Sequence, residues 1–147
     1  MKIPRIIPLI VGLVLLSACS VSWEAPIMRH GEKAILDVLD ATDGEAVFGR
    51  VDWVCMLHED DDIDDEMCVF YMTYNRDDAD HYMMVITSEP DGAPGLVAQR
   101  ATISGEAVLE AARIDLIEDI EQADTPIRYA SGTLDNETID SWIEARE

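Results

Sequence analysis

Alternation of apolar and polar residues marks the middle of the chain and predicts strands. Between residues 46 and 57 every second side chain is apolar or small, and the charged Arg50 and Asp52 fall between them. A period of two is typical of a half-buried strand. Three more runs rich in β-branched, aromatic and methionine residues follow: 67–74, 81–88 and 96–103. Four such runs joined by polar or turn-forming segments predict an antiparallel meander.

A spacing of three or four between apolar residues predicts helices in the C-terminal third. One stripe comprises Leu109, Ala112, Leu116 and Ile120. We expect this helix to begin after Ser104, a suitable N-cap, and to stop before Pro126. Residues 127–134 predict a fifth strand. A last helix, capped by Asp135 or Asn136, places Ile139, Trp142 and Ile143 on one face.

The segment before the first strand is less regular. Residues 32–44 have apolar residues at helical spacing, which favours a short helix over a strand. Pro26 and Gly31 interrupt residues 20–31, which we expect to form a tether. The predicted fold is therefore α+β, an antiparallel sheet of about four to five strands with roughly two to three helices packed on one face.

The first twenty residues, MKIPRIIPLIVGLVLLSACS, have the features of an export signal. Lys2 and Arg5 precede an apolar run at residues 6–16, which is too short for a membrane span of ~20 residues. The run ends in Leu16-Ser17-Ala18-Cys19. This motif resembles the lipobox of bacterial membrane lipoproteins.

The resemblance implies cleavage before Cys19, lipidation of its sulfur and acylation of the new N-terminus. More than one acyl chain holds a protein stably on a bilayer. Residues 1–18 are then a cleaved signal, 19–31 a lipidated tether and 32–147 one acidic globular domain. Ser20 after the cysteine is similar to the pattern of lipoproteins sorted to the outer membrane, at its periplasmic face or the cell surface. The alternative is an ordinary cleaved signal.

Charge narrows the range of partners. The chain carries 31 acidic and 10 basic residues, and two of the bases, Lys2 and Arg5, lie in the signal, so the mature part has a formal charge of −23. A polyanion of this kind disfavours nucleic acid and anionic lipid surfaces. It permits basic proteins and divalent cations, and it also fits a surface that is acidic for solubility.

The segment CMLHEDDDIDDEMC, residues 55–68, combines a cysteine pair with a dense acidic run. In an oxidising compartment, Cys55 and Cys68 predict a disulfide. Asp60, Asp62 and Asp64 match the opening of a calcium loop, but Asp65 and Tyr71 stand where an EF-hand needs Gly and Glu. The run is therefore either a weak Ca²⁺ site or a solvated hairpin tip, and no other cofactor is expected.

Other chemistries find less support. Cys55, His58, Cys68 and His81 contain the ligand types of a zinc site, but without a second close pair. Met56 with His58, and His81 with Met83, contain those of a copper(I) site. We find no nucleophile motif and no glycine-rich phosphate loop.

The preferred interpretation is a non-enzymatic accessory or interaction module, anchored to the membrane through Cys19. The alternatives are an inhibitor or scavenger of a basic protein such as a lysozyme, and a weak calcium-binding module.

Overall fold

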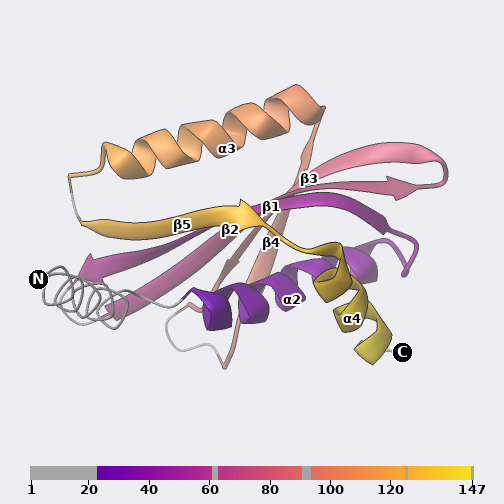
Figure 1. Ribbon diagram of the computed structural model, residues 1–147, viewed down its shortest axis with the longest axis horizontal. Coiled ribbons are helices and arrows are strands. Elements are labelled where there is room, and N and C mark those ends of the chain that lie inside the picture. Colours follow the sequence, from indigo (N-terminus) through magenta and orange to yellow (C-terminus); the bar gives the residue numbers. More distant parts are fainter. Residues whose placement is uncertain (1–22, 61–62, 91–93, 125, 147) are drawn as a thin grey trace, which may run out of the picture.

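The computed structural model describes residues 23–60, 63–90, 94–124 and 126–146, and the side chains of residues 59–65 lie outside this description. Eight elements follow one another along the chain, labelled as in Figure 1. They are α2 (Glu24–Ala41), β1 (Val47–Asp60), β2 (Ile63–Arg76), β3 (Ala79–Ser88), β4 (Val97–Ile103), α3 (Glu106–Glu121), β5 (Ile127–Thr133) and α4 (Asn136–Arg146). All strands pair antiparallel in the order β4-β3-β2-β1-β5, so the α+β class and the predicted meander are confirmed.

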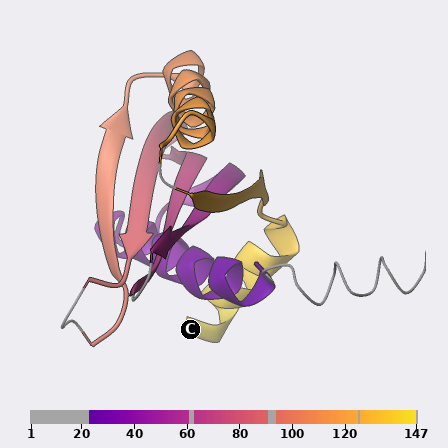
Figure 2. The same cartoon turned by 90° about the vertical axis from the view of Figure 1, so that its left-hand side faces the viewer.

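The helices cover both faces of the sheet, whereas the sequence pattern predicted one covered face. Figure 1 shows α3 above the sheet and α2 with α4 below it, and Figure 2 shows the same separation from the side. The reason lies in the central strands, where neighbouring residues such as Val54 and Cys55 are both fully buried. A strand that is apolar at consecutive positions buries both of its faces, so each face needs a cover.

Two cores result. The core under α2 and α4 contains Ile35, Val51, Phe70 and Trp142, among others. The smaller core under α3 is built around Val54, Met56, Tyr71 and Leu109. Trp53 and Cys55 of β1 face the first core, and Val54 and Met56, which alternate with them, face the second.

Helix α2 begins at Glu24, so residues 24–31 are its first half and not the expected tether. Pro26 is the third residue of the helix, where its missing N–H needs no partner. Gly31 is buried, and a Cβ at this position would lie 2.9 Å from Cη2 of Trp142 in α4. The glycine is thus a point of close helix packing, and neither residue interrupts the helix.

The remaining helix boundaries are close to those predicted. Helix α3 has Gly105 in extended backbone as its N-cap, without a side-chain cap from Ser104. At α4 the Asp135 carboxylate accepts a hydrogen bond of 3.2 Å from the backbone N–H of Glu137, which confirms Asp135 as the cap. Among the described residues, no helix has the length and apolarity that a membrane span requires.

Candidate functional site

A disulfide joins the two central strands. Cys55 and Cys68 are direct cross-strand partners with a Cα–Cα distance of 4.0 Å and an S–S distance of 2.11 Å. Both residues are fully buried. The predicted bridge is therefore confirmed, and it removes from the suggested zinc site the two thiolates that it needed.

Strands β1 and β2 continue past their neighbours as a two-stranded arm, which begins after His58 in β1 and on the tip side of Met67 in β2. They pair with each other from Met56 and Met67 out to Asp60 and Ile63. On one side β3 ends opposite Met67, and on the other β5 begins opposite His58. Among the residues that the structure describes, no strand therefore lies beside the outer part of the hairpin.

The paired residues of this arm include Glu59, Asp60, Asp64 and Asp65 of the acidic run. The calcium candidates Asp60, Asp62 and Asp64 lie outside the described residues, Asp62 completely and the other two in their side chains. A Ca²⁺ site there stays a prediction. The same holds for lipidation of Cys19, because residues 1–22 are outside the description as well.

Glu66 is the last acidic residue of the run, and its side chain contacts helix α2. Its Oε1 accepts hydrogen bonds of 2.9 Å from the Arg29 guanidinium and 2.7 Å from Nε2 of His30. The other ring nitrogen of His30, Nδ1, lies 2.7 Å from the hydroxyl of Thr87 in β3. His30 and Thr87 are both fully buried.

The protonation state of the His30 ring follows from the two groups that contact its nitrogens. A carboxylate only accepts, so Nε2 carries the proton of the neutral ring. Nδ1 then accepts from the Thr87 hydroxyl at 2.7 Å, a shorter contact than the 3.3 Å between this hydroxyl and the Cys68 carbonyl. Burial lowers the pKa of His30 from its ordinary 6.5, and the hydrogen bond and charge of Glu66 oppose this. Hydrolases also align a hydroxyl, an imidazole and a carboxylate, but their hydroxyl must reach substrate. Thr87 is enclosed, so the network joins α2 to the sheet and is not a catalytic group.

The sequence pattern did not single out His30. It lies in the segment interpreted as a tether, 36 residues before Glu66 and 57 before Thr87. The feature of the sequence that could have indicated its burial is its position four residues before the buried Ala34, on the inward face of α2. That signal becomes visible only once the helix is known to begin at Glu24.

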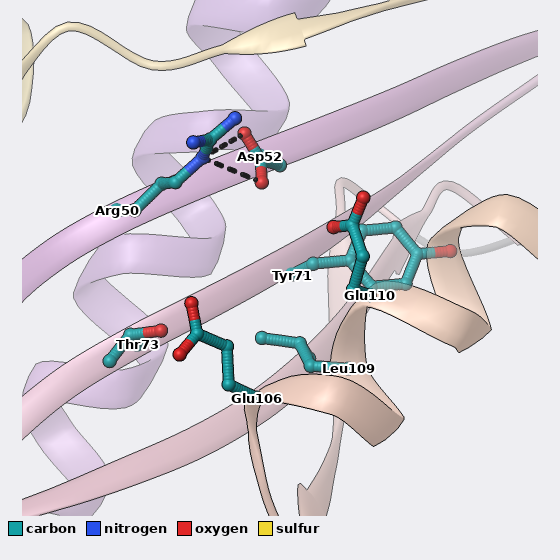
Figure 3. A pocket seen from close by; sticks show the side chains of 7 residues that line it. All are labelled: Arg50, Asp52, Tyr71, Thr73, Glu106, Leu109 and Glu110. Carbon is teal, nitrogen blue, oxygen red and sulfur yellow. Dashed lines mark hydrogen bonds and ion pairs between the residues drawn. The ribbon is translucent and has the colours of Figure 1, made fainter.

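A cavity of about 220 Å³ lies on the opposite face of the sheet, between β1, β2 and the first turns of α3. Figure 3 shows its seven lining residues. Arg50 and Asp52 come from β1, Tyr71 and Thr73 from β2, and Glu106, Leu109 and Glu110 from α3. Six of the seven lining side chains are polar and they come from three elements, so we take this cavity as the candidate binding site.

Two ion pairs border the cavity. Nε of Arg50 donates to both carboxylate oxygens of Asp52 at 3.0 Å, and Oδ1 of Asp52 also accepts a hydrogen bond of 2.6 Å from Thr133. On α3, Arg113 donates to Glu110. This hydrogen bond lowers the pKa of Glu110 and raises that of Arg113. In each pair the two opposite charges therefore compensate each other, and the pair has no net charge.

Three polar groups of the cavity make no hydrogen bond to the part of the chain that the structure describes. They are the carboxylate of Glu106 and the hydroxyls of Tyr71 and Thr73. The Tyr71 side chain is only 3% exposed. Burial raises the pKa of Tyr71 to about 12, against a smaller lowering by the charge of Arg113. Its hydroxyl therefore stays protonated at neutral pH.

The remaining metal candidates are not assembled into a site. Met56 belongs to the core under α3, and Met83 to the core under α2 and α4. The two halves of the suggested copper site therefore face opposite sides of the sheet. Nowhere in the described ranges do three His, Cys, Asp or Glu side chains converge as metal ligands.

Comparison with known proteins adds no relative. No protein family, curated protein or solved structure matches this chain.

Proposed function

We propose that this protein is a membrane-anchored lipoprotein that acts, without catalysis of its own, as an interaction module for a basic protein. The lipobox Leu16-Ser17-Ala18-Cys19 supports the anchor. The observation that carries the interaction role is the two-stranded arm of β1 and β2, which holds most of the acidic run beyond the rest of the sheet.

The construction of the arm suits recognition. The buried Cys55–Cys68 disulfide ties its two strands together at the base. Glu66 of β2 accepts hydrogen bonds from Arg29 and His30, which connect this strand to α2. Strands whose base is held in this way lose less conformational entropy on binding.

The charge of the whole protein supports the same class of partner. A formal charge of −21 for the full chain, with acids spread over every described helix, attracts a basic protein over a long range. Such attraction raises the association rate and is screened beyond a Debye length of ~8 Å at physiological salt.

Binding is tested with the mature protein in detergent and immobilised lysozyme as a basic probe. We expect the association rate to fall steeply as salt is raised. A variant with Glu59, Asp60, Asp64 and Asp65 changed to their amides should bind more weakly than one with Asp115, Glu118, Asp119 and Asp124 changed in the same way. Both variants lose equal charge, so a difference between them isolates the arm. Capture that is absent, or unchanged at high salt, contradicts the proposal.

The anchor is tested separately by fractionating cells that express the wild type and a Cys19→Ala variant. The wild type should sediment with membranes and the variant should be released. Retention of the variant in the membrane fraction contradicts the lipoprotein assignment.

A further inference from the structure

We propose that the free edge of β4 binds a second copy of this chain: the β4 strands of two copies pair antiparallel about a two-fold axis at Arg100 and join the two sheets into one. This inference goes beyond the proposed function, because it concerns another partner and a strand outside the arm.

Strand β4 is the last strand on one side of the sheet. It pairs with β3 along its whole length, from Val97 opposite Ser88 to Ile103 opposite Tyr82, and no strand lies on its other side in the part of the chain that the structure describes. Figure 2 shows it at the left margin of the sheet. Five of its seven residues are exposed, against three of seven in β5 at the opposite edge. Of the two edges, β4 is therefore the more accessible.

The features that normally protect a sheet edge are weak in β4. Natural proteins protect such edges with proline, bulges and unpaired charges. All seven residues of β4 are described, and they include no proline and no shift of register against β3. The single charged residue, Arg100, is compensated by Asp37 of α2, whose carboxylate lies 2.6 Å from the guanidinium. The edge therefore presents unpaired backbone groups without a net charge.

The distribution of acidic residues indicates which partner suits this edge. The chain has a formal charge of −21, so two copies repel each other wherever their carboxylates meet. Residues 92–105, which contain β4, are the longest stretch after Cys19 without Asp or Glu. Among the described elements, only β4 and β5 contain no acidic residue. A second acidic copy therefore meets less repulsion at β4 than at any helix or central strand, whereas a basic partner finds no carboxylate in this strand.

The sequence of β4 is self-complementary in an antiparallel pair. With the axis at Arg100, each remaining residue meets a residue of the other copy on the same face of the sheet: Val97 meets Ile103, Ala98 meets Thr102, and Gln99 meets Ala101. The β-branched ends of the strand therefore meet each other, and such cross-strand pairs stabilise a sheet. Val97 is 37% exposed in the single copy, and Ile103 of the second copy would cover it.

The two Arg100 side chains face each other at the axis. Like charges directly opposite each other destabilise a pair of strands. Here each arginine has Asp37 of its own copy as a counter-ion. Two-fold symmetry therefore brings two guanidinium groups and two carboxylates together around the axis, and this group of four has no net charge. The five N–H donors of a guanidinium allow it to contact the carboxylates of both copies.

The symmetry suits two chains on one membrane. Because the axis runs perpendicular to the sheet, α2 lies on the same face of the joined sheet in both copies. Two chains with the proposed anchor at Cys19, which precedes α2, can therefore share one bilayer. Such confinement raises the effective concentration of the two copies. This increase matters because a contact of two seven-residue strands is smaller than a standard interface of ~1,200–2,000 Å².

The first test is cysteine cross-linking, with diamide as the oxidant, in membranes of cells that express the full chain. Direct partners in an antiparallel pair have Cα atoms ~4.5–5.5 Å apart, which a disulfide can span. Arg100→Cys should therefore give a covalent dimer. In Gln99→Cys the two new cysteines lie diagonally, ~7–8 Å apart or more, and should give little. The wild type, in which Cys55 and Cys68 are already joined, should give none.

The second test adds carboxylates to the edge without a new thiol. Gln99→Glu/Ala101→Glu places acidic side chains opposite each other across the axis and should weaken the dimer about tenfold. Ala111→Glu/Gln122→Glu makes the same two substitutions at exposed positions of α3 and its C-cap, and should leave the dimer unchanged. Sedimentation equilibrium of the mature protein in density-matched detergent measures the dissociation constant. For the wild type this constant should fall as salt is raised, because salt screens the repulsion between the copies.

Three outcomes overturn the inference: no covalent dimer in Arg100→Cys, equal amounts of it in Arg100→Cys and Gln99→Cys, or a dissociation constant that Gln99→Glu/Ala101→Glu leaves unchanged. The lysozyme experiment keeps the two proposals apart, because salt weakens that binding and strengthens the dimer. If Arg100→Cys forms the dimer but lysozyme is not captured, self-association stands and the proposed function falls. If lysozyme is captured but no dimer forms, the proposed function stands and this inference falls.

Discussion

Nε2 of His30 in α2 lies 2.7 Å from Oε1 of Glu66 in β2, and this contact connects a fully buried ring to the last carboxylate of the acidic run. Because Nδ1 of the same ring meets Thr87 of β3, one side chain joins three elements. His30 is thus a structural centre of the face covered by α2.

Replacing His30 should destabilise the fold. In His30→Ala the Thr87 hydroxyl loses its contact of 2.7 Å with the ring and keeps only the contact of 3.3 Å with the Cys68 carbonyl, and a cavity opens in the core. We therefore expect a loss of about 2–4 kcal/mol in the free energy of unfolding. Urea unfolding followed by circular dichroism measures the loss. His81→Ala, at a partly exposed ring stacked on Tyr74, should cost less than half as much. Equal losses for the two variants contradict the central role of His30.

The same network makes stability depend on pH. The folded protein lowers the pKa of His30 from 6.5, so below this pH the unfolded chain binds the proton more readily than the folded one. The contribution of His30 is therefore full above pH 6.5, decreases as the pH falls below it and levels off below the folded pKa. Other groups titrate as well, so the measured quantity is the difference between wild type and His30→Gln at about pH 7.5 and at about pH 5.5. This difference should shrink at the lower pH; a constant or growing difference contradicts the lowered pKa.

The disulfide should contribute substantially to stability. The bridge spans a sequence separation of 13 residues, and closing a loop of about this size stabilises a fold by ~3 kcal/mol in the chain-entropy description. A Cys55→Ala/Cys68→Ala variant should lose this amount or more, because two buried sulfurs are removed as well. Thermal unfolding with and without a reductant measures the effect. The unreduced protein should take up no alkylating label at Cys55 or Cys68.

Replacing Gly31 with alanine tests how closely α2 packs on α4. Alanine raises helix propensity by about 1 kcal/mol relative to glycine, but its Cβ would lie 2.9 Å from Cη2 and 3.3 Å from Cζ3 of Trp142. Overpacking of this kind typically costs ~1–3 kcal/mol, so we expect Gly31→Ala to lower the melting temperature. Gly105→Ala is the matched control, because a Cβ there meets nothing within 4 Å. A melting temperature of Gly31→Ala above that of the wild type refutes this close packing.

Much of the fold was predictable because local patterns determine it. The alternating run 46–57 and the β-rich runs predicted all five strands, although β1 and β2 extend further into the acidic run than expected. The two cysteines of the predicted hairpin face each other. The assignment of helices to faces was not predictable from alternation, since the pattern of residues 46–57 marked one apolar face, whereas Val54 and Met56 make the other face apolar as well. Both sets of residues are buried, each by a different helix.

The candidate site was harder to predict than the fold. Tyr71 lies in the predicted strand 67–74 and is buried there, but the cavity that it lines exists only through the position of α3. His30 was missed because Pro26 and Gly31 are helix breakers on average. Whether they interrupt a helix depends on their place in it and on Trp142, which lies far away in the sequence.

The strand order also governs how the chain can fold. The meander from β1 to β4 forms from sequence neighbours, whereas the outer edge of β1 receives its partner only when β5 is available, as the separation of 81 residues between Asp52 and Thr133 illustrates. Until then Trp53, Val54 and Met56 lie along an open strand edge, and such edges pair readily with other chains. Contacts of long sequence separation form slowly. The last third of the chain therefore protects the first strand from aggregation, and a chain that ends before residue 127 should self-associate even though its meander is intact.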